Sequence, residues 1–317
     1  MPLHTIRRRQ FLKNTALFGA GLAIPASAHA AATGSKDHAL NVSIFSKHLQ
    51  FLGLADMAQA AADMGFDGVD LSVRPNGHVE PDRAGELLPQ AAEAFKKAGL
   101  SPLMMTCSVL DADNPTDRSV LETAARSGFR FYRMNYFHYL KDKTMPESVD
   151  YYRQRVGQLA ALNRKLGITG CYQNHAGNYI GASVWELFQL VKDVEKQDFG
   201  LQYDIRHAVV EGGLSWANGL KLVRDKIATL ALKDFRWEKT DGKWKVSDCP
   251  IGEGMVDFLS FFRLLKDYNL RVPVSLHYEY PLGGAEHGHK NITLDRQTVF
   301  DAMRRDLEKI RELWQKA

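Results

Sequence analysis

The sequence predicts an α/β protein of the (β/α)8 TIM barrel class, a single domain after an N-terminal signal peptide. Short apolar runs typical of buried strands alternate with amphipathic runs typical of helices along the chain. About 285 of the 317 residues remain after the signal peptide, close to the ~250 residues of one such barrel. Several apolar runs end abruptly in ionisable or amide side chains, and these barrels carry their chemistry at the strand ends.

Each predicted strand is a short apolar run, which is typical of a strand buried on both faces in a parallel sheet. The expected strands are Asn41–Ser46, Gly68–Val73, Ser101–Cys107, Phe129–Asn135, Ile168–Asn174, Gly200–Arg206, Ile227–Asp234 and Val272–Glu279. Between them, apolar residues recur at helical spacing. The expected helices are Leu54–Met64, Arg83–Ala98, Arg118–Ser127, Ser148–Leu166, Val184–Lys196, Trp216–Arg224, Val256–Tyr268 and Leu294–Gln315.

The alternation of strands and helices shows no break in composition, which favours one closed parallel barrel. An open doubly wound sheet also fits the alternation. However, no Gly-x-Gly-x-x-Gly run opens the first β-α unit, so nucleotide binding is not indicated. Gly65, Gly99 and Gly128 follow helical runs, where a left-handed C-terminal cap favours glycine.

The first residues of the chain have the layout of a secretory signal. A cationic stretch, Arg7–Lys13, precedes an uncharged and mostly apolar run, Asn14–Ala28, which ends in small residues. We therefore expect a signal peptide over residues 1–30, a linker over residues 31–40 and the barrel over residues 41–317.

The cationic stretch is typical of one export route. Arg8-Arg9-x-Phe11-Leu12-Lys13 resembles a twin-arginine signal, which exports proteins already folded, so we expect a periplasmic or exported protein. An uncleaved membrane anchor is the alternative, but the apolar run is short for a span of ~20 residues. We expect no stable membrane insertion elsewhere, because no other stretch is long and apolar enough.

The mature chain carries no net charge. Four of the 41 Lys and Arg residues and none of the 37 Asp and Glu residues lie in residues 1–30, which leaves 37 cations against 37 anions. A neutral protein has no general attraction for nucleic acid, so no nucleic-acid partner is expected. Cys107, Cys171 and Cys249 are too few, and odd in number, for a disulfide framework in an exported protein.

Polar side chains gather at the expected strand ends. Side chains in a strand alternate between two faces, so residues two apart share a face. Unpaired polar groups cost ~2–7 kcal/mol each to bury, so groups delivered to one end of a barrel indicate a ligand-receiving pocket. The pairs that share a face are Gln173 with His175, Gln202 with Asp204, Ala231 with Lys233, and His277 with Glu279.

Four runs resemble those of a known superfamily. They are Gly65-Phe-Asp-Gly-Val-Asp-Leu71, Tyr203-Asp-Ile-Arg-His207, Leu232-Lys-Asp234 and Gly252-Glu-Gly-Met-Val-Asp-Phe258. With these runs and the order of its units, the chain from Asn41 onward resembles the xylose-isomerase-like sugar isomerases and epimerases. This barrel superfamily also includes the type-2 abasic-site endonucleases.

The resemblance implies a divalent metal ion (Mn, Mg or Zn) as cofactor. In the superfamily the ion is held by a Glu ending strand five, an Asp ending strand six, a His in strand seven and a Glu ending strand eight. Here Asp204 matches the strand-six ligand, whereas Gln173, Ala231 and His277 stand at the other three positions. The predicted metal ligands are Asp204, His277, Gln173 and His175, in a site weaker than that of the superfamily.

The resemblance also implies proton transfer next to a carbonyl group. Glu279, Lys233 and His207 are the predicted catalytic residues. Lys233 is interpreted either as a base with a lowered pKa or as an electrostatic anchor for an enolate oxygen. The alternative is an ion pair with a neighbouring carboxylate, which would raise the pKa of Lys233 instead.

Further residues are predicted to contact the substrate. Arg133 can hold substrate hydroxyls or an anionic group, or it can pair with Asp70. His78 lies in a turn-rich loop that either reaches over the mouth or is simply solvated. The ring of Trp237 either packs on a sugar or pins the long loop Phe235–Gly254. The predicted substrate-binding residues are Asp70, Arg74, His78, Arg133, Arg206 and Trp237.

Three functions fit these features, and each of them implies a small-molecule carbohydrate as the substrate or ligand. The first is a periplasmic isomerase or epimerase with metal-assisted proton transfer. The second is a lyase or hydratase that acts on oxidised (3-keto) glycosides by the same enolisation, which export favours because sugar phosphates are scarce outside the cytoplasm. The third is a non-catalytic sugar-binding protein whose metal site has decayed, as Gln173 and Ala231 permit. The sequence indicates neither the substrate nor the oligomeric state.

Overall fold

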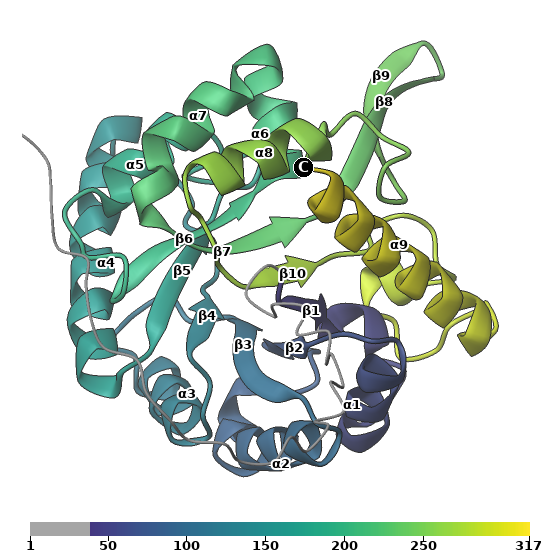
Figure 1. Ribbon diagram of the computed structural model, residues 1–317. Coiled ribbons are helices and arrows are strands. Elements are labelled where there is room, and N and C mark those ends of the chain that lie inside the picture. The colour runs from purple at the N-terminus through teal and green to yellow at the C-terminus, as the bar shows by residue number, and fades with distance from the viewer. Residues whose placement is uncertain (1–38) are drawn as a thin grey trace, which may run out of the picture. The chain divides into compact units, whose positions relative to one another are not determined.

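The computed structural model describes residues 39–317, apart from the side chain of Pro102. In this range eight parallel strands close into a barrel in the order β1-β10-β7-β6-β5-β4-β3-β2, with helices around its outside (Figure 1). The closed barrel confirms the predicted fold class. The predicted signal peptide and residues 31–38 of the predicted linker lie outside the described residues.

The strands and helices follow one another in β-α units, with a separate antiparallel hairpin near the C-terminus. The barrel strands are β1 (Val42–Phe45), β2 (Gly68–Val73), β3 (Ser101–Cys107), β4 (Phe131–Arg133), β5 (Thr169–Gln173), β6 (Phe199–Asp204), β7 (Ile227–Leu232) and β10 (Val274–Leu276), and the hairpin strands are β8 (Asp234–Thr240) and β9 (Lys243–Cys249). The α-helices are α1 (Leu54–Asp63), α2 (Ala84–Lys97), α3 (Pro115–Arg126), α4 (Met145–Leu166), α5 (Val184–Val191), α6 (Ile205–Gly212), α7 (Trp216–Val223), α8 (Phe258–Asp267) and α9 (Arg296–Lys316). Short 3-10 helices are η2 (Ser46–Leu49), η3 (Pro81–Arg83), η4 (Gly213–Ser215), η5 (Arg224–Lys226) and η6 (Ala285–His287).

Local sequence explains several element boundaries. Helix α4 begins one turn before its predicted start, because Thr144 and Glu147 form a capping box that satisfies the first backbone N–H groups. The glycines predicted to end helices all have a left-handed backbone, which costs glycine little. Their φ angles are 89° at Gly65, 76° at Gly99 and 95° at Gly128.

Two predicted boundaries near the strand ends are wrong. The sequence predicts that Arg206 ends a strand, but β6 ends at Asp204 and helix α6 begins at Ile205. The side chain of Asp204 accepts a hydrogen bond from the backbone N of His207 at 3.1 Å and thereby caps the helix. The predicted loop after strand seven is instead the hairpin β8–β9, which projects beyond the barrel (Figure 1). Asp241 and Gly242, with φ of 52° and 74°, form its tight turn.

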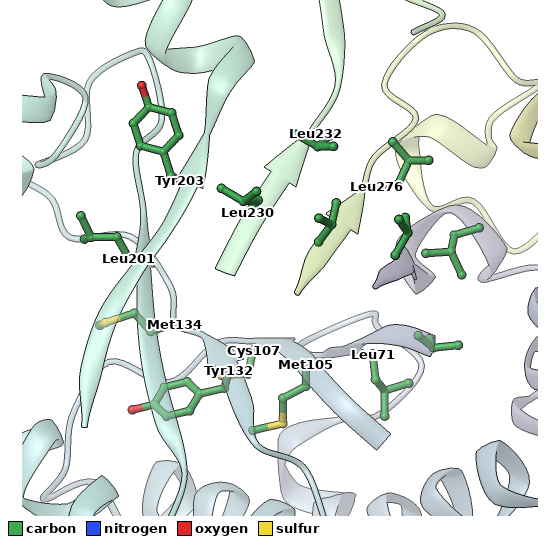
Figure 2. Packing of buried hydrophobic residues seen from close by; sticks show 14 of the residues in the cluster. Leu71, Met105, Cys107, Tyr132, Met134, Leu201, Tyr203, Leu230, Leu232 and Leu276 are labelled. Atoms are coloured by element: carbon green, nitrogen blue, oxygen red, sulfur yellow. The ribbon is translucent and has the colours of Figure 1, made fainter. Parts of the chain in front are cut away.

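The hydrophobic core lies between the barrel and its helices. Leu71, Met105 and Leu201 belong to this buried cluster and point away from the barrel axis (Figure 2). Burial of such apolar surface stabilises the fold by ~25 cal/mol per Å². The intervening strand positions hold buried polar residues, such as Asp70 and Thr106, which are joined by a 3.1 Å hydrogen bond. The outer face of the strands is thus apolar and packs against the helices, whereas their inner face carries polar side chains.

The helices of residues 39–317 differ in length and apolar character from a membrane-spanning helix. None of them is long and apolar enough to cross a membrane.

Candidate active site

Three charged side chains meet at the carboxyl ends of neighbouring strands. Asp204 is the last residue of β6, Lys233 follows β7, and Glu279 follows β10. Nζ of Lys233 lies 3.3 Å from Oδ2 of Asp204 and 4.0 Å from Oε1 of Glu279. These distances confirm the prediction that the polar strand ends converge on one mouth of the barrel.

The neighbouring carboxylates favour the charged form of Lys233. Burial by itself would lower the pKa of Lys233, but the negative charges of Asp204 and Glu279 outweigh it and raise that pKa above its ordinary value. The raised pKa disfavours the interpretation of Lys233 as a base with a lowered pKa. Its other two interpretations, an ion pair and an anchor for a negatively charged oxygen, are compatible with one another.

Glu279 is held between two ammonium groups. Oε2 of Glu279 accepts a 2.7 Å hydrogen bond from Nζ of Lys47, which lies just after β1, while Oε1 faces Lys233. Burial alone would raise the pKa of Glu279, but the charges of Lys233 and Lys47 outweigh it and hold the pKa well below its usual range. The half-buried carboxylate is therefore ionised at neutral pH.

Gln173 and Tyr136 extend the cluster across the mouth. Nε2 of Gln173, at the end of β5, donates to Oδ2 of Asp204 at 2.8 Å. Oε1 of Gln173 accepts a hydrogen bond from the hydroxyl of Tyr136 at 2.5 Å. The amide thus directs its nitrogen, and not its oxygen, toward the Asp204 carboxylate.

The rings of His207 and His175 lie against each other beside Asp204, with their centroids 3.9 Å apart and their planes tilted by 37°. Nδ1 of His207 accepts hydrogen bonds from the backbone N of Ala176 at 3.2 Å and from Arg206 at 3.0 Å, which places the ring proton on Nε2. That Nε2 has no hydrogen-bond partner and lies 3.8 Å from Oδ2 of Asp204.

Both of these imidazoles are neutral at neutral pH. Burial and the charge of Lys233 hold the pKa of His207 well below its ordinary value and lower that of His175 to about 4. A neutral ring that lies beside Asp204 without a charge of its own is suited to position that carboxylate.

His277 belongs to a polar network inside the barrel. Nε2 of His277 is 3.0 Å from Oγ of Ser275, which donates to Oδ2 of Asp70 at 2.6 Å. Thr106 donates to the same oxygen at 3.1 Å. Burial raises the pKa of Asp70, whereas burial and the charge of Lys233 hold the pKa of His277 well below its ordinary value. Asp70 therefore supports the floor of the site from within the barrel.

Two guanidinium groups lie over aromatic rings near this network. The guanidinium of Arg133 is 5.0 Å from the ring centre of Tyr136, and that of Arg74 is 5.5 Å from the ring centre of Phe45. Burial and the positive charge of Arg133 lower the pKa of Arg74, since two cations that lie near each other disfavour the charged form. The guanidinium groups favour an anion at this side of the mouth.

The remaining predicted substrate contacts lie outside the cluster. Arg206 pairs with Asp248 of the hairpin at 2.7 Å, so its charge is already balanced. Nδ1 of His78 lies 3.1 Å from Oγ of Ser46, beside β2. Trp237 is 42% exposed on β8 and contacts Phe235 through its ring edge. Contact of these residues with a substrate stays a prediction.

Lys47 and Tyr136 contribute to the site but were missed by sequence reasoning. Lys47 follows an apolar strand run in the same way as Lys233, so its position at a strand end was a usable signal. Tyr136 has no such signal, because β4 ends at Arg133 and the alternation of faces no longer applies beyond it.

The cluster does not fit the metal centre that the resemblance implies. In residues 39–317 no group of three or more His, Cys, Asp and Glu side chains is arranged to hold a metal ion. Ala231 offers no ligand atom, and the ammonium of Lys233 lies beside both carboxylates. The structure brings the following predicted ligands near one mouth without arranging them around a common ion: Asp204, His277, Gln173 and His175.

A separate hollow lies elsewhere on the molecule. A cavity of about 570 Å³ between α2 and α3 is lined by Pro89, Lys96 and Thr123, on the outside of the barrel. It contains none of the converging strand-end groups. We therefore place the candidate active site at the barrel mouth, where the charged groups converge.

Both the sequence and the structure of this protein resemble those of known proteins. The family described as xylose isomerase-like TIM barrel matches residues 58–297. No match was found among curated proteins. Among solved structures, the IolI protein with a bound zinc atom is 14% identical with a TM-score of 0.68, over 87% of this chain and 99% of that chain.

Two other similar structures are an epimerase and a probable dehydratase. The 3-keto-D-glucoside 4-epimerase YcjR from E. coli is 13% identical with a TM-score of 0.60, over 85% of this chain and 99% of its own. The probable 3-DHS dehydratase AsbF from Bacillus anthracis is 14% identical with a TM-score of 0.60, over the same shares. At these identities the likeness establishes the fold. Since the family match spans most of the closed barrel and its polar mouth, the chain belongs to the xylose isomerase-like TIM barrel family.

Proposed function

We propose that this protein is an enzyme that moves a proton at a carbon next to a carbonyl group of a carbohydrate. The observation that carries the proposal is the ammonium of Lys233, which lies between the carboxylates of Asp204 and Glu279 at the barrel mouth. A cation beside a half-buried carboxylate is the pair of groups that enolisation requires. The epimerase and the dehydratase among the similar structures support this reaction class.

Lys233 is suited to hold the carbonyl oxygen, and Glu279 is suited to remove the proton. The buried ammonium can donate to the oxygen and stabilise the negative charge that develops there as the enolate forms. In the free protein, the charges of Lys233 and Lys47 make Glu279 a weak base. When the ammonium of Lys233 donates a hydrogen bond to a substrate oxygen, it stabilises the negative charge of Glu279 less. The pKa of Glu279 then rises, and the carboxylate becomes a stronger base.

The fate of the enolate decides the product. Return of the proton to the other face of the same carbon gives an epimer. If that carbon bears a hydroxyl, delivery of the proton to the former carbonyl carbon, with transfer of the hydroxyl proton to the enolate oxygen, gives an isomer whose carbonyl has moved. Loss of a substituent from the next carbon gives elimination, as in a lyase of oxidised (3-keto) glycosides. The 3-keto-D-glucoside epimerase supports the first branch and the dehydratase supports elimination.

Deuterium incorporation from solvent tests the proposal. In D2O, the wild-type protein should place deuterium at the carbon next to the carbonyl of its substrate. Proton NMR of a panel of ketoses and 3-keto glycosides detects this exchange and distinguishes the three products. A sugar that binds, as shown by a rise in melting temperature, but exchanges no deuterium would contradict the enzymatic proposal. The non-catalytic sugar-binding function would then replace it.

We also propose that the substrate bears an anionic group held by Arg74 and Arg133. Replacement of Arg74 by Met should raise KM for an acidic sugar by ~10–100-fold and change kcat less, because hydrogen bonds to charged groups contribute ~1.5–3 kcal/mol. Steady-state kinetics with acidic and neutral analogues measure the effect. Arg83→Met is the matched control, since exposed Arg83 pairs with Glu86 on the surface. Equal effects on acidic and neutral sugars would contradict this substrate class.

We propose further that the protein acts outside the cytoplasm. Replacement of both Arg8 and Arg9 by Lys should leave the precursor in the cytoplasm, because the arginine pair is the address that the export receptor reads. Fractionation followed by immunoblotting measures the distribution. Arg7→Lys, one residue outside the pair, is the matched control and should be exported normally. Unchanged periplasmic yield of the double variant would exclude the twin-arginine route.

A further inference from the structure

Four charged side chains alternate in sign around the barrel mouth. In the order of the neighbouring strands β1, β10, β7 and β6, they are Lys47, Glu279, Lys233 and Asp204. Nζ of Lys47 is 2.7 Å from Glu279, and Nζ of Lys233 is 4.0 Å from Glu279 and 3.3 Å from Asp204. Two ammonium groups thus balance two carboxylates without a further cation.

The oxygen atoms of Asp204 and Gln173 already accept hydrogen bonds from protein donors. Oδ1 of Asp204 accepts from the backbone N of His207 at 3.1 Å, and Oδ2 accepts from Gln173 at 2.8 Å. The amide oxygen of Gln173 accepts from Tyr136 at 2.5 Å. A divalent ion needs several oxygen or nitrogen ligands with free lone pairs. At Asp204 and Gln173 those oxygens already accept from N–H and O–H groups of the protein.

We propose that the ammonium of Lys233 is the resident cation of this site and holds the position that a divalent metal ion would need between Asp204 and Glu279. A metal ion placed there would meet the positive charge of Lys233 in a buried setting, where repulsion is weakly screened. The mouth therefore takes no divalent cation, and Lys233 supplies one fixed positive charge. Lys233 occupies this position whichever reaction takes place at the mouth.

The wild-type protein provides the first measurement. It is purified without a metal-affinity step, incubated with Mn²⁺, Mg²⁺ or Zn²⁺, dialysed, and analysed for metal content. We expect far less than one ion per chain, and the same melting temperature with EDTA as with each ion. One divalent ion per chain that is lost in Asp204→Asn would overturn the inference.

Removal of the ammonium provides the second measurement. Lys233→Ala leaves Asp204 and Glu279 facing each other without the cation between them. Its melting temperature should rise by several degrees with Mn²⁺ and with methylammonium, since a ligand that binds the folded state stabilises it. Lys47→Ala is the matched control, because it removes a cation from the same Glu279 but leaves Lys233 in place. It should respond to neither ion.

A designed variant sharpens the comparison. The double variant Gln173→Glu with Lys233→Ala removes the ammonium and adds a third carboxylate at the mouth. It should therefore bind one Mn²⁺ per chain more tightly than Lys233→Ala does. A folded Lys233→Ala protein that responds to no cation would also overturn the inference. If that variant does not fold, the wild-type metal content decides by itself. Absence of deuterium exchange would contradict the proposed function and leave the metal result unchanged.

Discussion

Replacement of Glu279 by Gln should lower the rate of deuterium exchange by ~10²–10⁴-fold, which is the usual contribution of a general base. The substitution keeps the size of the side chain and its contact with Lys47, but it removes the lone-pair basicity that takes up the proton. Substrate affinity should change much less than rate. Exchange followed by NMR gives the rate, and calorimetry gives the affinity.

A surface variant controls for the loss of one negative charge. Glu253→Gln makes the same chemical change at an exposed loop position, and it should exchange deuterium at the wild-type rate. If Glu279→Gln also exchanges at the wild-type rate, another group removes the proton, and the assignment of Glu279 as base is wrong.

Replacement of Asp234 by Ala should have the largest effect on stability. Its carboxylate accepts hydrogen bonds from four backbone N–H groups, which belong to Phe235, Gly252, Gly254 and Val256, at 2.8, 2.9, 3.0 and 3.2 Å. Each buried donor left without a partner costs ~1–3 kcal/mol, so we expect the free energy of unfolding to fall by at least ~3 kcal/mol. Urea denaturation followed by circular dichroism measures the change.

Two further variants make this prediction specific. Asp234→Asn keeps one accepting oxygen and should lose less stability than Asp234→Ala. Asp225→Ala removes a carboxylate that is 88% exposed and pairs with Arg224, so it should change stability by less than ~1 kcal/mol. A loss for Asp234→Ala no larger than that of Asp225→Ala would show that the loop is not held by this carboxylate.

The same contacts explain a run that carries the resemblance to the superfamily. A Cβ atom at Gly254 would lie 2.2 Å from Oδ1 of Asp234 and 2.4 Å from the backbone O of Phe235. Glycine is therefore required for close packing of the loop onto Asp234. The Lys233-Asp234 pair combines two roles, because the lysine points to the mouth and the aspartate ties down the loop behind it.

Much of the fold and part of the site could be predicted from the sequence. Strand and helix periodicity are local properties, so the barrel class and the end of β6 at a polar residue follow from the chain itself. The tight turn at Asp241-Gly242 was also a local signal, and it predicts the hairpin once it is noticed. By contrast, whether Arg206 lies in a strand or in a helix depends on whether the side chain of Asp204 caps α6. An aspartate side chain permits this cap but does not require it.

The sequence by itself determined that polar side chains follow the apolar strand runs and which of these side chains share a face. Only the tertiary structure decided how their charges pair. Closure of the barrel places β10 between β1 and β7, so Glu279 meets Lys47 and Lys233, which come from distant parts of the chain. Coulomb energy depends on distance and burial, and neither is a local property of the sequence. The same closure brings two carboxylates to the ammonium of Lys233. Their charges raise the pKa of Lys233 and so favour its role as a cation over that of a base.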